Sequence, residues 1–381
     1  SSGATVVISQ FYGARHKDDV RKAVHTSIAL SIAGGAVIMV LGIAFAGVAL
    51  RAMNTPEDIM SLSVTYMRIY FLGVIPSLIY NMGSGILRAI GDSKRPLYYL
   101  IASTLTNIVL DLFFVVVLRM GVAGVAIATT LSQFASAGMV IYALMKTDDM
   151  YKLYPREIRF SPSILSAIIR IGLPAGLQST MYSVSNLIIQ ASINSFGTDT
   201  IAAWTAYSKV DGMFWMIMSA YGVSITTFAG QNFGAGKYDR IRKSVRVCMG
   251  MSAFTSVLLS VIVMAGGRFF LGLFTSDPGV VDIGMSIIHV IAPTYITYIC
   301  IEILGGTARG CGDSIIPMLL TCFGVCVLRV IWILGIVPLH RDLATVAFSY
   351  PLTWAVTSVM FIVYYLRGNW LKRNMPQGTE A

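Results

Sequence analysis

Two polar residues, Asn107 and Asp111, lie four positions apart inside a long run of apolar residues. On a helix, residues with this spacing share one face. A carboxylate surrounded by lipid is costly, because loss of water disfavours its charged form, and such a residue usually serves a purpose. The pair therefore predicts a site that takes up a proton or a small cation. The alternative is a structural Asp that bonds to a neighbouring helix.

A second set of polar residues marks one face of another apolar segment, and its amides are Gln178, Asn186, Gln190 and Asn194. Unpaired amides in lipid are costly, so this face either looks into a cavity or bonds to a neighbouring helix. Tyr182 lies on the same segment, and aromatic side chains bind flat, cationic molecules through stacking and cation–π contacts. We predict a substrate cavity lined by Gln178, Tyr182 and Asn186, together with Glu302 from a later segment.

Other charged residues also lie within apolar segments. Glu302 either binds a cationic molecule in the cavity or is protonated and structural. Arg329 would repel a cation, and it either pairs with Glu302 or extends toward the membrane surface. Lys209 and Asp211 are two residues apart and hence on different faces of a helix, so we do not expect an ion pair between them. A binding role for either of these two is the less favoured alternative.

The remaining candidates for chemistry are too dispersed to form an active site or a metal centre. The four His residues are scattered, and the five Cys residues lie in or beside apolar segments without paired or metal-type spacing. We therefore expect no catalytic residues, no metal site and no cofactor. The protein is not expected to be an enzyme.

The composition is that of a membrane protein. Of the 381 residues, 56% are hydrophobic and 12% are charged, with a mean hydropathy of +0.73; soluble domains carry about 25% charged residues. Apolar runs long enough to cross a bilayer recur without strand-like alternation, so helices rather than a barrel are expected. We predict an all-α polytopic membrane protein with ten complete spans, at 24–50, 57–84, 96–118, 122–145, 163–195, 200–232, 244–270, 279–307, 315–339 and 343–366.

The net charge of +10 is explained by topology. The loops on one side of the predicted spans carry 21 Lys and Arg residues, against 4 on the other side. By the positive-inside rule, the basic side is cytoplasmic, which places the C-terminus in the cytoplasm. We predict a multi-pass protein of the cell (plasma) membrane, with the lipid bilayer as its surroundings, no nucleic-acid partner and no obligate protein partner.

The chain repeats itself at a separation of 221 residues. The segment Ser9–Val24 resembles Gly230–Val245, and Gly85–Leu97 resembles Gly306–Met318 at the same offset. The second pair contains an Arg-x-x-Gly-Asp turn before a Pro, in which Gly permits a tight turn and Asp caps the next helix. Two motifs that share one offset indicate a duplication. Because six predicted spans separate equivalent positions, the two repeats are expected to be parallel.

The duplication predicts how the chain is divided. We expect two parallel six-helix repeats, of which the first lacks its first helix and most of its second, because the second repeat begins near Pro162. The predicted parts are an N-terminal lobe at 1–147 with the remnant of helix 2 and helices 3–6, a cytoplasmic inter-lobe linker at 148–162, a C-terminal lobe at 163–368 with helices 7–12, and a cytoplasmic tail at 369–381.

Ordered motifs along the whole chain resemble those of the multidrug and toxic compound extrusion (MATE) transporters. They are Gly-Gln-Asn-Phe-Gly-Ala-Gly at 230–236 with its partner at 9–14, Arg-Ala-Ile-Gly-Asp at 88–92, Arg-Gly-Cys-Gly-Asp at 309–313, Asn-Ile-Val-Leu-Asp at 107–111 and Gly-Leu-Pro at 172–174. The resemblance implies two six-helix lobes around a central cavity. It also implies a cation-coupled antiporter, driven by H⁺ or Na⁺, that exports amphipathic, often cationic, drugs or metabolites by alternating access.

The resemblance adds Thr129 to the predicted ion site, as a contributor of oxygen beside Asn107 and Asp111. In the family, a further Asp on the first helix joins this cluster, and it has no counterpart here. The second repeat has Leu328 and Trp332 at the equivalents of Asn107 and Asp111, so cation coupling is expected in the first lobe alone.

A lipid-linked oligosaccharide flippase is the alternative function. Such a protein would need a cavity rich in cations to hold pyrophosphate. Apart from the basic residues near the ends of the predicted spans, which are counted with the loops, the intramembrane basic residues are Arg68, Lys209 and Arg329, and this scarcity disfavours the alternative.

Overall fold

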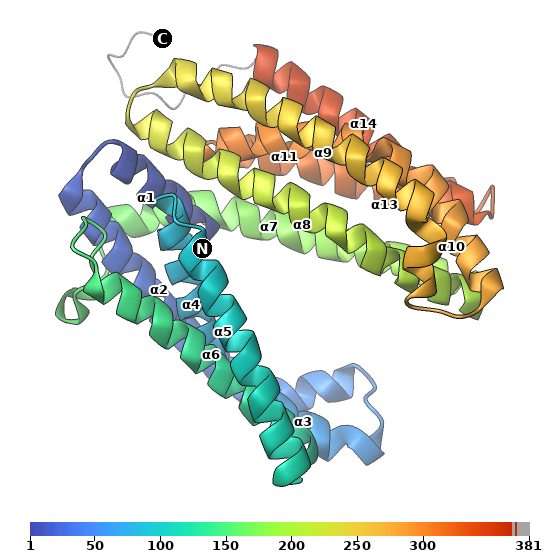
Figure 1. Ribbon diagram of the computed structural model, residues 1–381, viewed down its shortest axis with the longest axis horizontal. Coiled ribbons are helices and arrows are strands. Elements are labelled where there is room, and N and C mark those ends of the chain that lie inside the picture. The colour runs from blue at the N-terminus through green and yellow to red at the C-terminus, as the bar shows by residue number, and fades with distance from the viewer. Residues whose placement is uncertain (368–369, 372–381) are drawn as a thin grey trace. The chain divides into compact units, whose positions relative to one another are not determined.

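The computed structural model describes residues 1–367 and 370–371, and every regular element in this part of the chain is a helix. Its contacts divide the chain into two compact units, Ser1–Ile169 and Arg170–Ala381, each of which is described by itself. Figure 1 shows long helices running alongside one another within each unit. The all-α prediction is confirmed.

The first unit is a bundle of apolar helices. Its elements are α1 (Ser2–Gly13), α2 (Lys17–Ala52), α3 (Glu57–Leu72), α4 (Val74–Ala89), α5 (Lys94–Asp111), the π-helical turn η1 (Leu112–Val117), α6 (Gly121–Lys146), the 3-10 turn η2 (Pro155–Glu157) and the beginning of α7 (Pro162–Asn194). Helix α4 packs against α1, α2 and α6, and α5 packs mainly against α6. The end of α5, which carries the predicted ion site, therefore has α6 as its principal neighbour.

The predicted span 57–84 is not one straight helix. Helices α3 and α4 meet at Gly73 with a bend of 43°. Pro76 lies in the first turn of α4, where its missing N–H interrupts the hydrogen bonds that would continue α3. A Cβ at Gly73 would lie 2.6 Å from Gln133 Oε1 of α6, so the glycine also allows a close approach at the break.

The second unit contains the rest of the helices. Its elements are the greater part of α7, α8 (Thr198–Gly234), α9 (Tyr238–Gly272), α10 (Pro278–Ile291), the 3-10 turn η3 (Ala292–Thr294), α11 (Tyr295–Gly310), α12 (Ile315–Thr321), the π-helical turn η4 (Cys322–Val327), α13 (Leu328–Gly335) and α14 (Leu343–Arg367). Helix α8 packs against α9, α10 and α11, and α11 also packs against α14.

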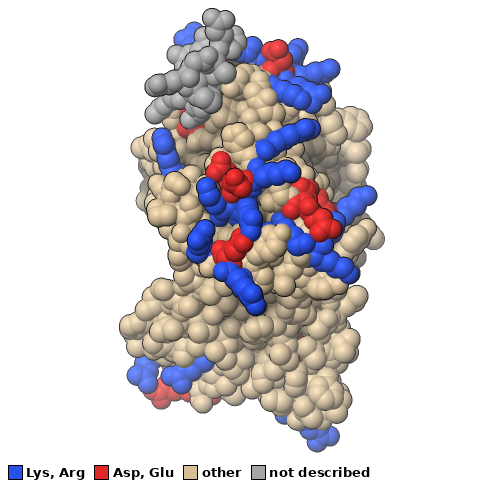
Figure 2. All heavy atoms as spheres, turned by 90° about the vertical axis from the view of Figure 1, so that its left-hand side faces the viewer, with Lys and Arg blue, Asp and Glu red and all other residues tan. Residues whose placement is uncertain are grey.

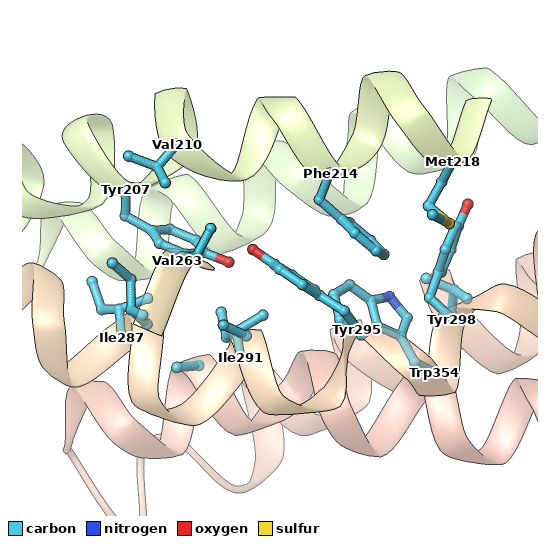
Figure 3. Packing of buried hydrophobic residues seen from close by; sticks show 14 of the residues in the cluster. Tyr207, Val210, Phe214, Met218, Val263, Ile287, Ile291, Tyr295, Tyr298 and Trp354 are labelled. Atoms are coloured by element: carbon cyan, nitrogen blue, oxygen red, sulfur yellow. The ribbon is translucent and has the colours of Figure 1, made fainter. Parts of the chain in front are cut away.

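Large aromatic side chains fill the middle of the second unit (Figure 3). Phe214 of α8 and Tyr295 of α11 stack with their ring centroids 3.9 Å apart. The indole of Trp354, on α14, lies 6.4 Å from each of these two rings. Three helices thus meet in one apolar core, and Tyr295 brings a hydroxyl group into it.

The structure agrees with the predicted number of membrane spans. Nine described helices are long and apolar enough to cross a bilayer, and the bent pair α3 and α4 makes ten if it counts as one span. These ten elements correspond in order to the ten predicted segments.

The duplication extends to individual hydrogen bonds. Thr5 Oγ1 of α1 donates to the carbonyl oxygen of Gly85 on α4 at 3.2 Å. In the second unit, Thr226 Oγ1 of α8 donates to the carbonyl oxygen of Gly306 on α11 at 3.0 Å. Both pairs are related by the offset of 221 residues, so each unit joins equivalent helices by the same contact.

The repeated turn also has the predicted structure. Gly91 and Gly312 have φ angles of 96° and 93°, a left-handed conformation that favours glycine. Asp92 Oδ1 accepts hydrogen bonds of 3.1 Å from the backbone N–H groups of Lys94 and Arg95, at the start of α5. The Asp side chain therefore satisfies otherwise free donors at a helix N-terminus, as predicted.

The predicted inter-lobe linker, 148–162, is attached to α2. The backbone N–H of Tyr154 donates to His25 Nε2 at 3.0 Å, and the N–H of Ser161 donates to Thr26 Oγ1 at 3.1 Å. The division between the two compact units falls after this segment, between Ile169 and Arg170 of α7. By its contacts, the linker is part of the first unit.

The predicted tail, 369–381, lies mostly outside the described residues. Trp370 and Leu371 are described, and both are buried in a small apolar cluster with Ile241 and Cys311.

Candidate functional site

The predicted ion pair lies at the C-terminal end of α5. Asp111 is the last residue of this helix, and the π-helical turn η1 follows it directly. Such turns are frequent at functional sites. Asn107 Nδ2 and Asp111 Oδ1 are both buried, and neither atom has a hydrogen-bond partner. Buried polar atoms are rarely left in this state, so the carboxylate oxygen marks a place that a proton or a cation can complete, and the amide N–H group marks one that an acceptor can complete.

Thr129, the third residue of the predicted ion site, lies on α6, which is the principal neighbour of α5. Ser103 Oγ of α5 donates to the carbonyl oxygen of Ser132 on α6 at 2.6 Å, one turn from Thr129. Within the described residues, no hydrogen bond joins Thr129 to Asn107 or Asp111. The structure therefore brings the three residues onto adjacent helices without a direct bond between them.

The second unit contains a cavity of about 690 Å³ with polar and aromatic walls. Its lining residues are Ser179, Tyr182, Asn186, Ile189, Gln190, Trp204, Ser208, Asp211, Trp215, Met218, Ser219, Tyr298, Glu302, Arg329 and Tyr350. Three of the four predicted substrate residues, Tyr182, Asn186 and Glu302, are among them. Gln178 is not, although it shares their helix face. The predicted polar face of α7 thus borders a cavity over part of its length.

Glu302 has protein partners on two sides. Its Oε2 accepts a hydrogen bond of 3.0 Å from the hydroxyl of Tyr298, and its Oε1 lies 3.9 Å from Arg309 Nη2. A Cβ at Gly222 would overlap the carboxylate, so Glu302 lies against the backbone of α8. The alternative in which Arg329 pairs with Glu302 is not found, because the basic group near Glu302 is Arg309, two turns later on the same helix.

Asp211 lines the cavity, although a binding role for it was the less favoured alternative from the sequence. Its side chain is 7% exposed, yet it lines the cavity. Its Oδ1 accepts a hydrogen bond from the hydroxyl of Tyr295, and its Oδ2 accepts one from Trp215 Nε1, both at 2.7 Å. From the sequence, Asp211 was compared with Lys209 as a possible ion-pair partner, and its hydrogen bonds with aromatic residues were not predicted. The sequence feature that could have indicated these bonds is Trp215, a hydrogen-bond donor four residues away on the same helix face.

Arg329 is the basic residue of the cavity wall. Its side chain is 2% exposed and therefore does not extend to the membrane surface. Its Nη2 donates to Thr353 Oγ1 at 3.1 Å, and its guanidinium carbon lies 4.1 Å from the centre of the Tyr350 ring. Its Nε is buried and has no hydrogen-bond partner.

Among residues 1–367 and 370–371, no three His, Cys, Asp or Glu side chains gather in a group that could hold a metal ion. The charged side chains that line the cavity of the second unit are Asp211, Glu302 and Arg329. Such a site can bind and orient charged or aromatic molecules.

Comparison with known proteins identifies relatives along most of the chain. A sequence model of the family described as MatE matches residues 1–113 and 174–334. The probable multidrug resistance protein YoeA of Bacillus subtilis (strain 168) is 26% identical over 374 residues, which cover 96% of this chain and 80% of YoeA. The probable multidrug resistance protein YpnP of the same organism is 30% identical over 281 residues, which cover 74% of this chain and 62% of YpnP.

Solved structures share the fold. The crystal structure of MATE in the bent conformation aligns with a TM-score of 0.90 at 22% identity, covering 98% of this chain and 83% of that one. The outward-facing conformation of a multidrug resistance MATE family transporter of the MOP superfamily aligns with a TM-score of 0.89, also at 22% identity, over 98% of this chain and 84% of that one. Together with the apolar helices, the match to the family model shows a multi-pass membrane protein.

Proposed function

Since this chain belongs to the MATE family of transporters, we propose that it is a cation-coupled antiporter that exports amphipathic, often cationic, compounds by alternating access. Members of this family are secondary transporters rather than enzymes, and the curated relatives are named as multidrug resistance proteins. We therefore take multidrug efflux as the general activity, and we propose cation coupling and a class of exported compound in addition to it.

The observation that carries the coupling step is the unsatisfied carboxylate oxygen of Asp111 at the end of α5. Asn107 Nδ2 and Asp111 Oδ1 are buried without hydrogen-bond partners. A proton or a Na⁺ ion bound to the Asp111 carboxylate would neutralise its charge, and a charged carboxylate within an apolar membrane segment has a high free-energy cost. Because the second repeat has Leu328 and Trp332 at the equivalent positions, we assign coupling to the first unit alone.

The cavity of the second unit supports the assignment of the exported compounds. Its aromatic walls, including Trp215 and Tyr298, suit flat molecules, and the carboxylates of Asp211 and Glu302 favour a positive charge. Its volume of about 690 Å³ is within the range of pockets that hold drug-sized ligands.

The distribution of basic residues supports a cytoplasmic C-terminus and insertion in the plasma membrane. Figure 2 shows a face on which Lys and Arg side chains gather, with Asp and Glu among them, next to broad areas that carry neither. We assign this pattern to loops that lie against the anionic lipid surface of the cytoplasmic leaflet.

The flippase alternative has less support from the cavity. Of the described residues that line it, Arg329 alone is basic, whereas Asp211 and Glu302 are acidic. A pyrophosphate would meet two carboxylates and one guanidinium, which is unfavourable.

Transport in vesicles tests the proposal. Purified parent protein and its Asp111→Asn variant are reconstituted, ethidium is enclosed, and its movement is followed after a proton gradient or a Na⁺ gradient is imposed. We expect one gradient to drive export by the parent, and the variant to lose at least about tenfold in rate. The control is Asp58→Asn, which removes an exposed carboxyl at the start of α3.

Three results would contradict parts of the proposal. Export by Asp111→Asn at the parent rate excludes coupling through this residue. Failure of both gradients to drive export by the parent excludes cation antiport. Translocation of a lipid-linked oligosaccharide by the parent, without movement of ethidium, favours the flippase.

A further inference from the structure

A second cavity of the second unit lies between α8 and α9, and we call it the α8–α9 groove. Its volume is about 680 Å³, and it shares no lining residue with the cavity that contains Asp211 and Glu302. Figure 1 shows the two helices side by side, and they pack against each other. On α9, its lining includes Lys243, Val247 and Met251, which are four residues apart and therefore share one helix face.

The groove has the length of one bilayer leaflet. Its lining on α9 extends from Arg240 to Met251. At 1.5 Å per residue, this part of the helix is about 16 Å long. The hydrocarbon core of a bilayer is about 30 Å thick, so the groove covers about half of it.

Most of the groove offers only apolar contacts. Ser224 Oγ and Ser244 Oγ line it, but each donates to a carbonyl oxygen of its own helix at 2.8 Å. At the end remote from Arg240, the hydroxyl of Tyr221 is hydrogen-bonded to Thr255 Oγ1 at 2.9 Å. These polar groups are satisfied by the protein, so the partner that suits this part of the groove is a hydrocarbon chain.

The other end of the groove is positively charged. Arg240 and Lys243 line it, and both side chains are exposed. Among the residues that the structure describes, neither has an ion pair or a side-chain hydrogen bond. The proposed orientation places this end at the cytoplasmic surface, where basic side chains meet anionic lipid headgroups.

The duplication shows that the two unpaired cations are particular to the second unit. The equivalents of Arg240 and Lys243 in the first repeat are Asp19 and Lys22, which lie 3.8 Å apart. The equivalent of Val247 is Thr26, whose Oγ1 accepts a hydrogen bond from the linker. In the first unit, this location is therefore neutralised by an acid and bonded to the chain's own linker.

We propose that the α8–α9 groove binds one anionic phospholipid of the cytoplasmic leaflet. Its phosphate lies between Arg240 and Lys243, and one acyl chain lies along Val247 and Met251. A zwitterionic phospholipid fits less well, because its cationic headgroup is repelled by the two basic side chains. The inference uses the proposed orientation of the basic loops, but it does not depend on the coupling ion or on the exported compounds.

Two lipids with the same acyl chains and different headgroups test the proposal. The purified protein is freed of lipid in detergent and titrated with phosphatidylglycerol or with phosphatidylcholine. Native mass spectrometry counts the lipids that each chain retains. We expect the first phosphatidylglycerol to bind at least about tenfold more tightly than the first phosphatidylcholine.

Charge variants show where the headgroup binds. The pair Arg240→Gln and Lys243→Gln, combined in one protein, should lose about tenfold in affinity for phosphatidylglycerol and keep its affinity for phosphatidylcholine within about twofold. The matched control combines Arg242→Gln and Arg246→Gln. It removes the same charge from exposed positions of the same helix that do not line the groove, and it should retain the preference of the parent.

A variant that fills the groove shows where the acyl chain lies. Ser224→Trp places a large side chain in the groove and should weaken the binding of both lipids by about tenfold. Val223→Trp is the control, because Val223 is exposed on the same helix and does not line the groove. If Ser224→Trp does not fold, the two charge pairs decide.

Five outcomes would overturn the inference. Equal affinity of the parent for both lipids excludes recognition of an anionic headgroup. An equal loss in the two charge pairs indicates a general basic surface instead of this groove. Unchanged lipid binding by folded Ser224→Trp excludes the groove as the place of the chain. Displacement of phosphatidylglycerol by glycerol phosphate indicates a site for soluble phosphates, and a lipid-free mass of two chains indicates that a second copy covers the groove.

Discussion

Thr226 Oγ1 of α8 donates a 3.0 Å hydrogen bond to the carbonyl oxygen of Gly306 on α11. The helix backbones can approach this closely because Gly306 lacks a side chain, and a Cβ there would lie 2.8 Å from Ile225 Cγ2. One turn further along α11, a Cβ at Gly310 would lie 2.5 Å from the carbonyl oxygen of Thr226. Small residues thus set the spacing between α8, which carries Asp211, and α11, which carries Glu302.

Replacement of Gly310 by Ala should destabilise the second unit. The added methyl group would force α8 and α11 apart against backbone atoms that cannot move independently, at a cost of about 1–3 kcal/mol. The measurement is the unfolding temperature of the purified protein in detergent. Gly250→Ala on α9 is the matched control, because a Cβ there meets nothing within 4 Å. Equal behaviour of the two variants would show that the helices do not approach as described.

Replacement of Tyr295 by Phe should destabilise the protein through Asp211. The variant keeps the ring that stacks on Phe214 but removes the hydroxyl that donates to Asp211 Oδ1. Leaving a buried carboxylate without this donor is expected to cost about 1–3 kcal/mol in the free energy of unfolding.

A double-mutant cycle with Asp211→Asn checks the cause. If the hydroxyl acts through the carboxylate, the cost of Tyr295→Phe should be smaller when Asp211 is already replaced. Additive effects of the two substitutions would indicate that the hydroxyl of Tyr295 stabilises the core in another way.

Acidification should weaken the attachment of the linker to α2. Arg21 donates to Glu157 from Nε at 2.7 Å and also from Nη2. This hydrogen bonding lowers the pKa of the Glu157 carboxyl below its ordinary value of 4.5. A carboxyl with a lowered pKa in the folded state stabilises the fold fully above its unfolded pKa, and this contribution is lost as pH falls through the folded pKa.

The unfolding temperature of Glu157→Gln relative to the parent measures this contribution. The parent should be the more stable protein at neutral pH, and the difference should shrink as the pH is lowered below about 4.5. Arg21→Gln should show the same pH dependence, and the double variant should show no further loss. A difference between parent and Glu157→Gln that is independent of pH would exclude this ion pair as its source.

The membrane spans and the duplication were predictable because both depend on properties that are local in sequence. The length of an apolar run decides whether a helix can cross a bilayer, whatever its neighbours are. The turn at Gly91 and its equivalent at Gly312 require a left-handed glycine and a capping Asp, and all of these residues lie within a few positions of one another. The bend at Gly73 was missed because the length of the apolar run was given more weight than Gly73 and Pro76, two residues that commonly interrupt a helix.

The partners of the charged residues were less predictable. A pair between Glu302 and Arg329 was one of two alternatives considered for Arg329, but Arg309 is the basic residue near Glu302. Asp211 was compared with Lys209, whereas its donors are Trp215 on its own helix and Tyr295, 84 residues away. Helical spacing tells which residues share a face, but it does not tell which helix that face meets.

The amino-acid sequence by itself determined that the protein is a helical membrane transporter built from two repeats, and it located Asn107 and Asp111 as the candidate ion site. Tertiary structure alone decided that Asp211 and Glu302 are satisfied by protein donors, and that Arg329 lies buried on Tyr350 with donors to spare. The physical reason is that the cost of a buried charge depends on the atoms around it, and those atoms come from helices far apart in the chain.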